Sequence, residues 1–101
     1  MIIYELSKLS KLDLEEIWVW TLDNFSENQA DYYIENLIYK IEEYCKHLEN
    51  DIVIEQHFLD YKYVFYQSHY IFYLKTSENK ISIVRILHQN RNITRILKIH
   101  S

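Results

Sequence analysis

The sequence predicts one α+β domain over residues 1–101, in the element order β-α-α-β-β-β, with a helical hairpin packed on one face of an antiparallel sheet. Two observations carry this prediction. In the first half, apolar residues recur every three or four positions in two consecutive segments, as in amphipathic helices. In the second half, three segments of β-branched and aromatic residues are separated by short polar turns, as in an antiparallel meander. The length suits a single core.

The first predicted elements are a strand over Met1–Leu6 and a helix from about Lys8 to Asp23. Ser7 is the expected N-cap, because its side-chain oxygen can accept a hydrogen bond from a free amide of the first turn. The apolar stripe of this helix comprises Leu14, Ile17, Trp18, Thr21, Leu22 and Phe25. Asp13, Glu15 and Glu16, in the front half of the helix, are placed favourably for the helix dipole.

A second helix begins after Ser26, which forms an S-x-x-Q capping box with Gln29. Its apolar stripe holds for five turns and comprises Ala30, Tyr33, Ile34, Leu37, Ile38, Ile41, Cys45 and Leu48. We expect this helix to end near Glu49–Asp51. Because the link between the two helices is short, they should form an antiparallel hairpin.

The second half begins with a polar connection over residues 50–60, which has room for one helical turn or a short edge strand. The three strands that follow are predicted at Tyr61–Tyr66, His69–Lys75 and Lys80–His88, with turns at 67–68 and 76–79. Residues 89–101 form a short amphipathic tail or a final helical turn. The face of the sheet opposite the helices is expected to stay partly open.

Composition excludes several classes of protein. There is no Gly and no Pro, so the turns must use Asn, Asp and Ser, and Gly-dependent nucleotide-binding loops are excluded. No apolar run approaches the roughly 20 residues that span a bilayer, and no signal peptide is evident, which predicts a cytoplasmic protein that does not contact membranes. The lone Cys45 lies on the apolar stripe of the second helix, which predicts a buried, inert thiol.

Charge is distributed unevenly along the chain. Residues 1–50 contain 4 Lys and Arg against 11 Asp and Glu, a net charge of −7, whereas residues 51–101 contain 7 against 4, a net charge of +3. The acidic half should repel nucleic acid and the basic half could approach an anionic partner, so nucleic-acid binding by this chain alone is not expected. Glu on solvated helix faces and Lys on strand edges would give the same asymmetry.

No motif predicts a metal or a cofactor. The five histidines stand at positions 47, 57, 69, 88 and 100, and none are three or four residues apart on a helix. The spacing predicts no metal site, and no fingerprint of a cofactor-binding fold is present.

One group of residues could carry out chemistry on RNA. Arg85 stands within an otherwise apolar strand, where a buried cation needs a partner or a function. Together with His88, Tyr70 and Lys62 it could stabilise a phosphate and supply acid/base groups on the open face of the sheet. In the structural alternative, Arg85 pairs with a helix carboxylate and His88 caps its strand.

Three aromatic residues are expected to face solvent. At 100° per residue, Trp20 falls off the apolar stripe of the first helix, and Tyr32 and Tyr39 fall opposite the stripe of the second. Exposed Trp and Tyr are typical of protein interfaces, so these residues could contact a partner protein or a second copy. A general excess of Tyr in this composition would also account for them.

Four segments together resemble the ParE/RelE toxin superfamily, the ParE branch in particular. They are Asp13–Trp18, Gln29–Ile34, His69–Tyr73 and Ile83–Gln89 with Arg91. The resemblance implies a toxin of a bacterial type II toxin–antitoxin system, of the kind associated with plasmid stabilisation. Its partner would be a cognate antitoxin whose C-terminal segment wraps the toxin in a hetero-oligomer.

The resemblance also separates two modes of action. ParE-like toxins are associated with inhibition of DNA gyrase, whereas RelE-like toxins are endoribonucleases that cleave mRNA on the ribosome. Tyr70 stands where the ribonuclease branch often has Arg, which favours a ParE-like, non-enzymatic toxin with no catalytic residues. The expected partner-binding residues are then Trp20, Tyr32, Tyr39, Arg91 and Arg95. A degenerate, non-toxic member that retains antitoxin binding is the third alternative.

Overall fold

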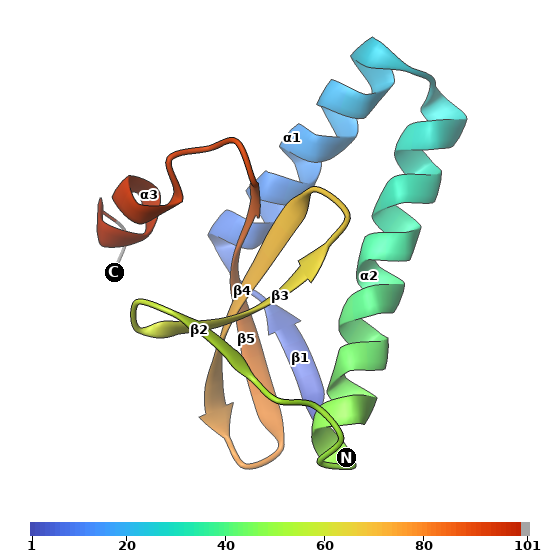
Figure 1. Cartoon of the computed structure of the whole chain (residues 1–101). Coiled ribbons are helices and arrows are strands. Elements are labelled where there is room, and N and C mark those ends of the chain that lie inside the picture. The colour runs from blue at the N-terminus through green and yellow to red at the C-terminus, as the bar shows by residue number, and fades with distance from the viewer. Residues whose placement is uncertain (100–101) are drawn as a thin grey trace.

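The computed structural model describes residues 1–99 and has three helices around one five-stranded sheet (Figure 1). The chain order is β1 (Ile3–Leu6), α1 (Lys8–Asn24), α2 (Glu27–Glu49), β2 (Gln56–Phe58), β3 (Tyr61–Tyr66), β4 (His69–Ser77), β5 (Lys80–His88) and α3 (Ile93–Ile99). The predicted α+β class, the helical hairpin and the order of the six main elements are confirmed. The connection after α2 contributes the short edge strand β2, and the tail contributes the helix α3.

The sheet has the strand order β1-β5-β4-β3-β2 and is mixed. The strands β2 to β5 are antiparallel to one another, as predicted, but β1 pairs in parallel with β5, from Ile3 opposite Lys80 to Leu6 opposite Ile83. This parallel pair brings the first strand of the chain beside the last one. Between them in the sequence lie the helical hairpin and the strands β2 to β4.

Serine side chains begin both long helices, as the sequence predicts. The Ser7 hydroxyl accepts a hydrogen bond from the Ser10 amide at 3.1 Å, and the Ser26 hydroxyl accepts one from the Gln29 amide at 3.1 Å. Each bond satisfies an amide of the first turn that has no partner within the helix. Both helices therefore start at residues fixed by local sequence.

Two apolar clusters cover the two faces of the sheet. The larger one joins α2 to the sheet through residues such as Leu37, Ile41, Ile71 and Ile83. The smaller one lies on the opposite face, where Leu97 of α3 is buried against side chains that include Phe72, Tyr61 and Leu87. The face predicted to be partly open is thus partly covered by α3 (Figure 1).

Phe25, a member of the predicted stripe of α1, faces solvent. Phe25 caps the C-terminal end of α1 and is 63% exposed. It lies at the tip of the hairpin, beyond the reach of the sheet, so helical periodicity alone did not predict its environment. Instead its ring lies 6.0 Å from that of Trp20.

Among residues 1–99, three turn residues have positive φ angles, although none is glycine. Asp51 belongs to the residue types expected there, but Leu59 and Gln67, with φ of 55° and 54°, do not. Leu59 and Gln67 are the first residues after β2 and β3, in turns of two residues that reverse the chain. A non-glycine residue in this region is strained by contact between its Cβ and the backbone.

Candidate functional site

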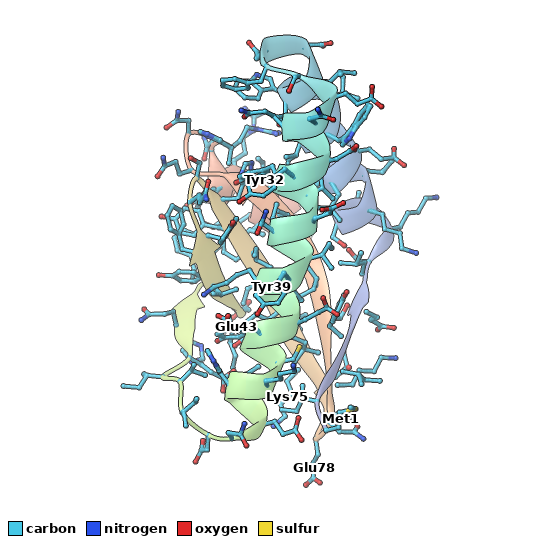
Figure 2. The ribbon with its side chains drawn as sticks, turned by 90° about the vertical axis from the view of Figure 1, so that its right-hand side faces the viewer. Met1, Tyr32, Tyr39, Glu43, Lys75 and Glu78 are labelled. Carbon is cyan, nitrogen blue, oxygen red and sulfur yellow. The ribbon has the colours of Figure 1, made fainter. Side chains whose placement is uncertain are left out.

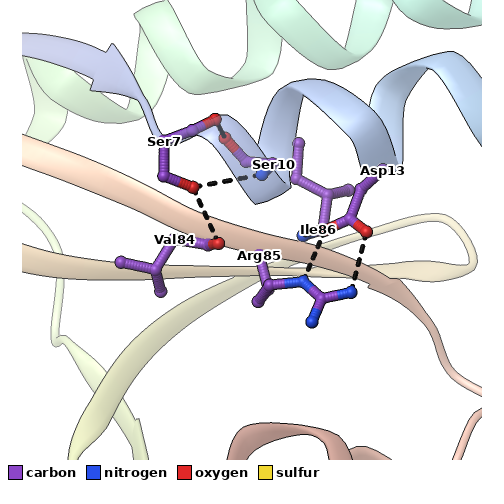
Figure 3. Close-up of polar contacts among 6 residues, drawn as sticks. All are labelled: Ser7, Ser10, Asp13, Val84, Arg85 and Ile86. Atoms are coloured by element: carbon purple, nitrogen blue, oxygen red, sulfur yellow. Dashed lines mark hydrogen bonds and ion pairs between the residues drawn. The ribbon is translucent and has the colours of Figure 1, made fainter. Parts of the chain in front are cut away.

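The cation in the apolar strand pairs with a carboxylate of α1. Arg85 donates through Nε to Asp13 Oδ2 and through Nη2 to Asp13 Oδ1, both at 2.9 Å (Figure 3). The Ile86 amide donates to the same Oδ2 at 2.9 Å. The two side chains are only 11% and 6% exposed. The bidentate geometry and the third bond offset part of the cost of burying both charges. The pairing is the one that the structural alternative for Arg85 describes, with a carboxylate on a helix.

The same contact zone fixes the start of α1 against β5. The Ser7 hydroxyl donates to the Val84 carbonyl at 2.9 Å, and the Ser7 amide donates to the Ile83 carbonyl at 2.9 Å. The Ser10 hydroxyl donates to the Ser7 carbonyl at 2.9 Å (Figure 3). The hydrogen bonds that Arg85 donates to Asp13 raise the pKa of Arg85, so its guanidinium is held charged.

His88 ends its strand by a local hydrogen bond, as the structural alternative predicted. Its Nδ1 accepts from the Asn90 amide at 3.0 Å. Its ring lies 5.2 Å from that of His69 on the neighbouring strand, to which it is paired directly in the sheet. The Asn90 contact links His88, the last residue of β5, to the turn that leads to α3.

His69 is a buried residue that the sequence analysis did not single out. Its Nδ1 lies 2.6 Å from the Tyr33 hydroxyl of α2. Burial, and secondarily the neighbouring His88, lowers the pKa of His69 to about 4. Burial likewise raises the pKa of Tyr33 to about 12. A neutral imidazole bonded to a neutral phenol joins α2 to the sheet and is poorly suited to activate a nucleophile near neutral pH. A correct prediction of the strand register would have placed His69 directly opposite His88, and that pairing could have drawn attention to His69.

The four candidates for chemistry on RNA do not form one cluster. Directly paired residues point to the same face of a sheet, and Lys62 is paired with Tyr73 of the α2-side core, whereas Tyr70 is paired with Leu87 of the α3-side cluster. Lys62 therefore lies on the face opposite Tyr70. Its ammonium forms an ion pair with Glu55 at 3.2 Å. With Arg85 bound to Asp13, the candidates are divided among separate environments.

Tyr70 belongs to an aromatic cluster, not to a polar site. Its ring lies 4.8 Å from that of Phe65, 5.3 Å from that of Tyr63 and 5.8 Å from that of Phe72. The cluster covers the β3–β4 part of the sheet beside α3. Aromatic contacts at these distances stabilise the sheet beyond their buried area.

Among residues 1–99, no group of three or more His, Cys, Asp or Glu side chains could hold a metal ion, and no helix is long and apolar enough to cross a membrane. His100 lies outside the described residues. Cys45 is buried in α2, as predicted, and burial raises the pKa of its thiol.

The three aromatic residues predicted to face solvent do so. Trp20 is 60% exposed, Tyr32 is 70% exposed and Tyr39 is 64% exposed. Tyr32 and Tyr39 follow one another along α2 in Figure 2. Arg91 and Arg95 are also exposed, the first in the turn after β5 and the second in α3. The five residues thus occupy two separate surfaces, one on the helical hairpin and one beside α3.

An open groove, which the sequence analysis missed, runs between α2 and the outer edge of the sheet. Its volume is about 510 Å³, and its lining includes Lys40, Tyr44, Ile54 and Phe65. The strand β2 pairs only with Tyr61–Tyr63, so it does not cover the second half of β3. The groove depends on where β2 ends, which no local pattern in residues 50–60 predicts.

Comparisons with known proteins agree on one family. Residues 4–93 match the family described as the ParE toxin of the type II toxin–antitoxin system parDE. The chain is 32% identical over 94 residues to "Toxin ParE1" of Mycobacterium tuberculosis, in strains CDC 1551 and H37Rv, covering 93% of this chain and 96% of the relative. It also matches a solved structure titled "Chromosomal ParDE TA system from P. aeruginosa", with a TM-score of 0.70 and 11% identity, over 87% of this chain and 96% of the other. The structural match extends to the fold alone.

Proposed function

Because this chain belongs to the ParE toxin family of type II toxin–antitoxin systems, we propose that it binds and inhibits DNA gyrase and that a cognate antitoxin neutralises it. The proposed action is binding, not catalysis, and it takes place in the bacterial cytoplasm. The observation that carries this choice is the engagement of Arg85 by Asp13. A ribonuclease would need a free cation beside acid/base groups, and here that cation is neutralised by a buried carboxylate.

The distribution of the remaining candidates supports the same choice. Lys62 is held by Glu55, Tyr70 is packed among aromatic rings, and His88 accepts a backbone hydrogen bond. The alternative, a ribosome-dependent endoribonuclease, would require these groups to converge on one phosphate. They lie on both faces of the sheet, so a single substrate would not reach all of them.

Partner contacts are assigned in this proposal to the exposed aromatic residues Trp20, Tyr32 and Tyr39 and to Arg91 and Arg95. We place a segment of the antitoxin in the groove between α2 and β3. The uncovered edge of β3 offers main-chain hydrogen bonds to an extended peptide, and the exposed Ile54 and Phe65 offer apolar contacts beside it. The proposed assembly is a toxin–antitoxin hetero-oligomer.

Controlled expression of the chain in bacteria tests the mode of action. Induction without antitoxin should arrest growth and switch on a DNA-damage reporter, and co-expression of the antitoxin should restore growth. Primer extension on translated mRNA should give no new cuts at codon positions. Such cuts would establish the ribonuclease alternative, and normal growth at confirmed expression would indicate a degenerate member.

The groove assignment has its own test, in affinity for the antitoxin. The substitutions Ile54→Glu and Phe65→Glu change exposed side chains at the groove and should weaken antitoxin binding by roughly 10-fold or more, because a charge would face the buried peptide. The matched control, Leu74→Glu, alters an exposed apolar residue of β4 that does not line the groove. If the two groove variants bound the antitoxin as tightly as the Leu74→Glu control, the antitoxin would not lie in the groove.

A further inference from the structure

The tip of the helical hairpin carries apolar side chains that nothing in the described part of the chain covers. Trp20 and Phe25 contact one another across the end of α1 and are 60% and 63% exposed. Val19 beside them is also exposed, and every residue from 23 to 29 is exposed. The tip extends past the end of the sheet in both views of the molecule (Figures 1 and 2). A projecting pair of aromatic rings is a shape that fits into a concavity of a partner.

The charges around this apolar tip have one sign. Residues 12–39 contain no Lys or Arg, but they contain seven carboxylates. Asp13 is bound to Arg85, and the other six are exposed, namely Glu15, Glu16, Asp23, Glu27, Asp31 and Glu35. The nearest cations along the chain are Lys11 and Lys40. The tip is therefore an aromatic surface on a hairpin whose own exposed charges, from residue 12 to residue 39, are all negative.

Helix stability explains only part of the arrangement of these carboxylates. Glu27 lies in the first turn of α2, where the helix dipole favours a negative charge. Glu27, Asp31 and Glu35 follow at intervals of four residues on α2, so they repel one another at about 0.2–0.5 kcal/mol for each pair. Stabilised solvent-facing helices usually place Lys or Arg at these intervals. One of the six has a structural contact: Asp31 accepts a hydrogen bond from Trp18 Nε1 at 2.9 Å. Glu16 acts electrostatically on Arg85 and helps to raise its pKa. For Glu15, Asp23 and Glu35, no contact within the hairpin accounts for the clustering.

We propose that the hairpin tip, residues 15–35, is the surface with which the toxin engages its protein target, and that it inserts into a concave, Lys- and Arg-rich surface of that target. Charge complementarity selects the occupant, because a negative tip is repelled by nucleic acid and by acidic surfaces but attracted to a basic cleft. The aromatic rings supply apolar contact at the centre and the carboxylates supply attraction at the rim. This inference rests on the proposed function, in which the toxin acts by binding a protein.

Matched charge variants test the inference. The tip variant is Glu15→Gln/Asp23→Asn/Glu35→Gln, and the control variant is Glu42→Gln/Asp60→Asn/Glu78→Gln. All six side chains are exposed, and each variant removes three negative charges, so both change the net charge from −4 to −1. Glu78 lies at the end of the molecule opposite the tip (Figure 2). The affinity of purified protein for gyrase should fall on the order of 10- to 100-fold for the tip variant, with a weaker salt dependence. The control variant should keep its affinity.

A second pair of variants tests the apolar contacts. Trp20→Ser/Phe25→Ser removes the ring pair, and Ile52→Ser/Leu74→Ser removes two exposed apolar side chains that lie outside both the hairpin and the groove. The first pair should weaken gyrase binding by about 10-fold or more and the second should leave it unchanged. Thermal unfolding of all variants confirms that each is folded.

The outcomes separate this inference from the proposed function. Inhibition of gyrase by the wild type and equally by both tip variants would overturn the inference alone. Loss of antitoxin affinity in the tip variants, with gyrase inhibition intact, would assign the tip to the antitoxin and also overturn it. Without gyrase inhibition by the wild type, the proposed target is wrong, and growth arrest decides instead: arrest lost by the tip variants alone supports the inference. Arrest by every variant, or by none including the wild type, contradicts it.

Discussion

Asp13 and Arg85 are 72 residues apart in sequence and form a bidentate ion pair that joins the first turns of α1 to the strand β5. A third hydrogen bond, from the Ile86 amide, satisfies the same carboxylate. The pair explains two residues that would otherwise be costly, a carboxylate on the inner side of α1 and a guanidinium within an apolar strand. It therefore stabilises the packing of the helical hairpin on the sheet.

Removal of one partner of this pair should destabilise the protein strongly. Asp13→Asn leaves the Arg85 guanidinium buried without a counter-charge, and we expect the free energy of unfolding to fall by about 3–5 kcal/mol. Chemical denaturation followed by circular dichroism measures the change. The control is Glu15→Gln, an exposed carboxylate on the same helix, which should have an effect within about 0.5 kcal/mol. Similar stability of the two variants would show that the pair contributes little.

The buried His69 should make the protein less stable in mild acid. Its pKa is lowered from 6.5 to about 4 in the folded state, so the unfolded chain takes up a proton below pH 6.5 that the folded protein refuses until about pH 4. Tyr33 contacts the ring through its hydroxyl, and His88 and Asp13 act on it electrostatically. Stability should fall as the pH drops through this window.

The contribution of His69 can be isolated by thermal unfolding at several pH values. His69→Gln should flatten the dependence of Tm on pH between 6.5 and 4, although it lowers Tm at neutral pH by removing a buried ring. His57→Gln, at an exposed position of β2, should preserve the slope of the wild type. An unchanged slope in His69→Gln would assign the acid sensitivity to other groups.

The two strained turns should be improved by glycine. Gln67→Gly and Leu59→Gly relieve the contact of Cβ with the backbone at φ near 55°. After the greater flexibility of the unfolded chain is counted, each should add roughly 0.5–1 kcal/mol to the free energy of unfolding. Ser68→Gly, one residue along at a negative φ angle, should destabilise instead. Urea denaturation compares the three variants, and a loss of stability in both glycine variants at positive φ would refute the assignment of strain.

The residues considered for chemistry on RNA should be dispensable for toxicity. A triple variant, Lys62→Ala/Tyr70→Phe/His88→Gln, removes their functional groups while leaving Arg85 and Asp13 in place. Lys62 loses an ion pair with a partly exposed Glu55, which is worth at most about 1 kcal/mol. Growth arrest on induction should persist at equal protein levels. A folded triple variant without toxicity would favour the enzymatic alternative.

Much of the fold could be predicted because its signals are local. The N-caps Ser7 and Ser26, the stripe of α2 and the bounds of β3 depend on neighbouring residues, and each was predicted within a residue or two. The parallel pairing of β1 with β5 could not be predicted, because it joins distant segments. The predicted environment of Phe25 was wrong for a related reason. Helical phase gives the side of α1 on which a residue lies, but not whether the sheet extends far enough to cover it.

The sequence likewise predicted some features of the candidate site and missed others. Helical phase predicted the exposure of Trp20, Tyr32 and Tyr39, since only the angle around the helix was needed. Arg85 was expected to pair with a helix carboxylate, but the choice of Asp13 among the acidic residues of α1 required the three-dimensional packing. The division of Lys62 and Tyr70 between opposite faces depends on strand register, which shifts every side chain when it changes by one residue.

Titration of purified toxin against a fixed amount of DNA gyrase in a supercoiling assay tests the central claim, that the protein acts by binding and not by catalysis. The account predicts that inhibition rises with the amount of toxin, saturates as the gyrase becomes fully bound, and is reversed by added antitoxin. Uninhibited supercoiling in the presence of a large excess of folded protein, for a chain that arrests growth on induction, would contradict it.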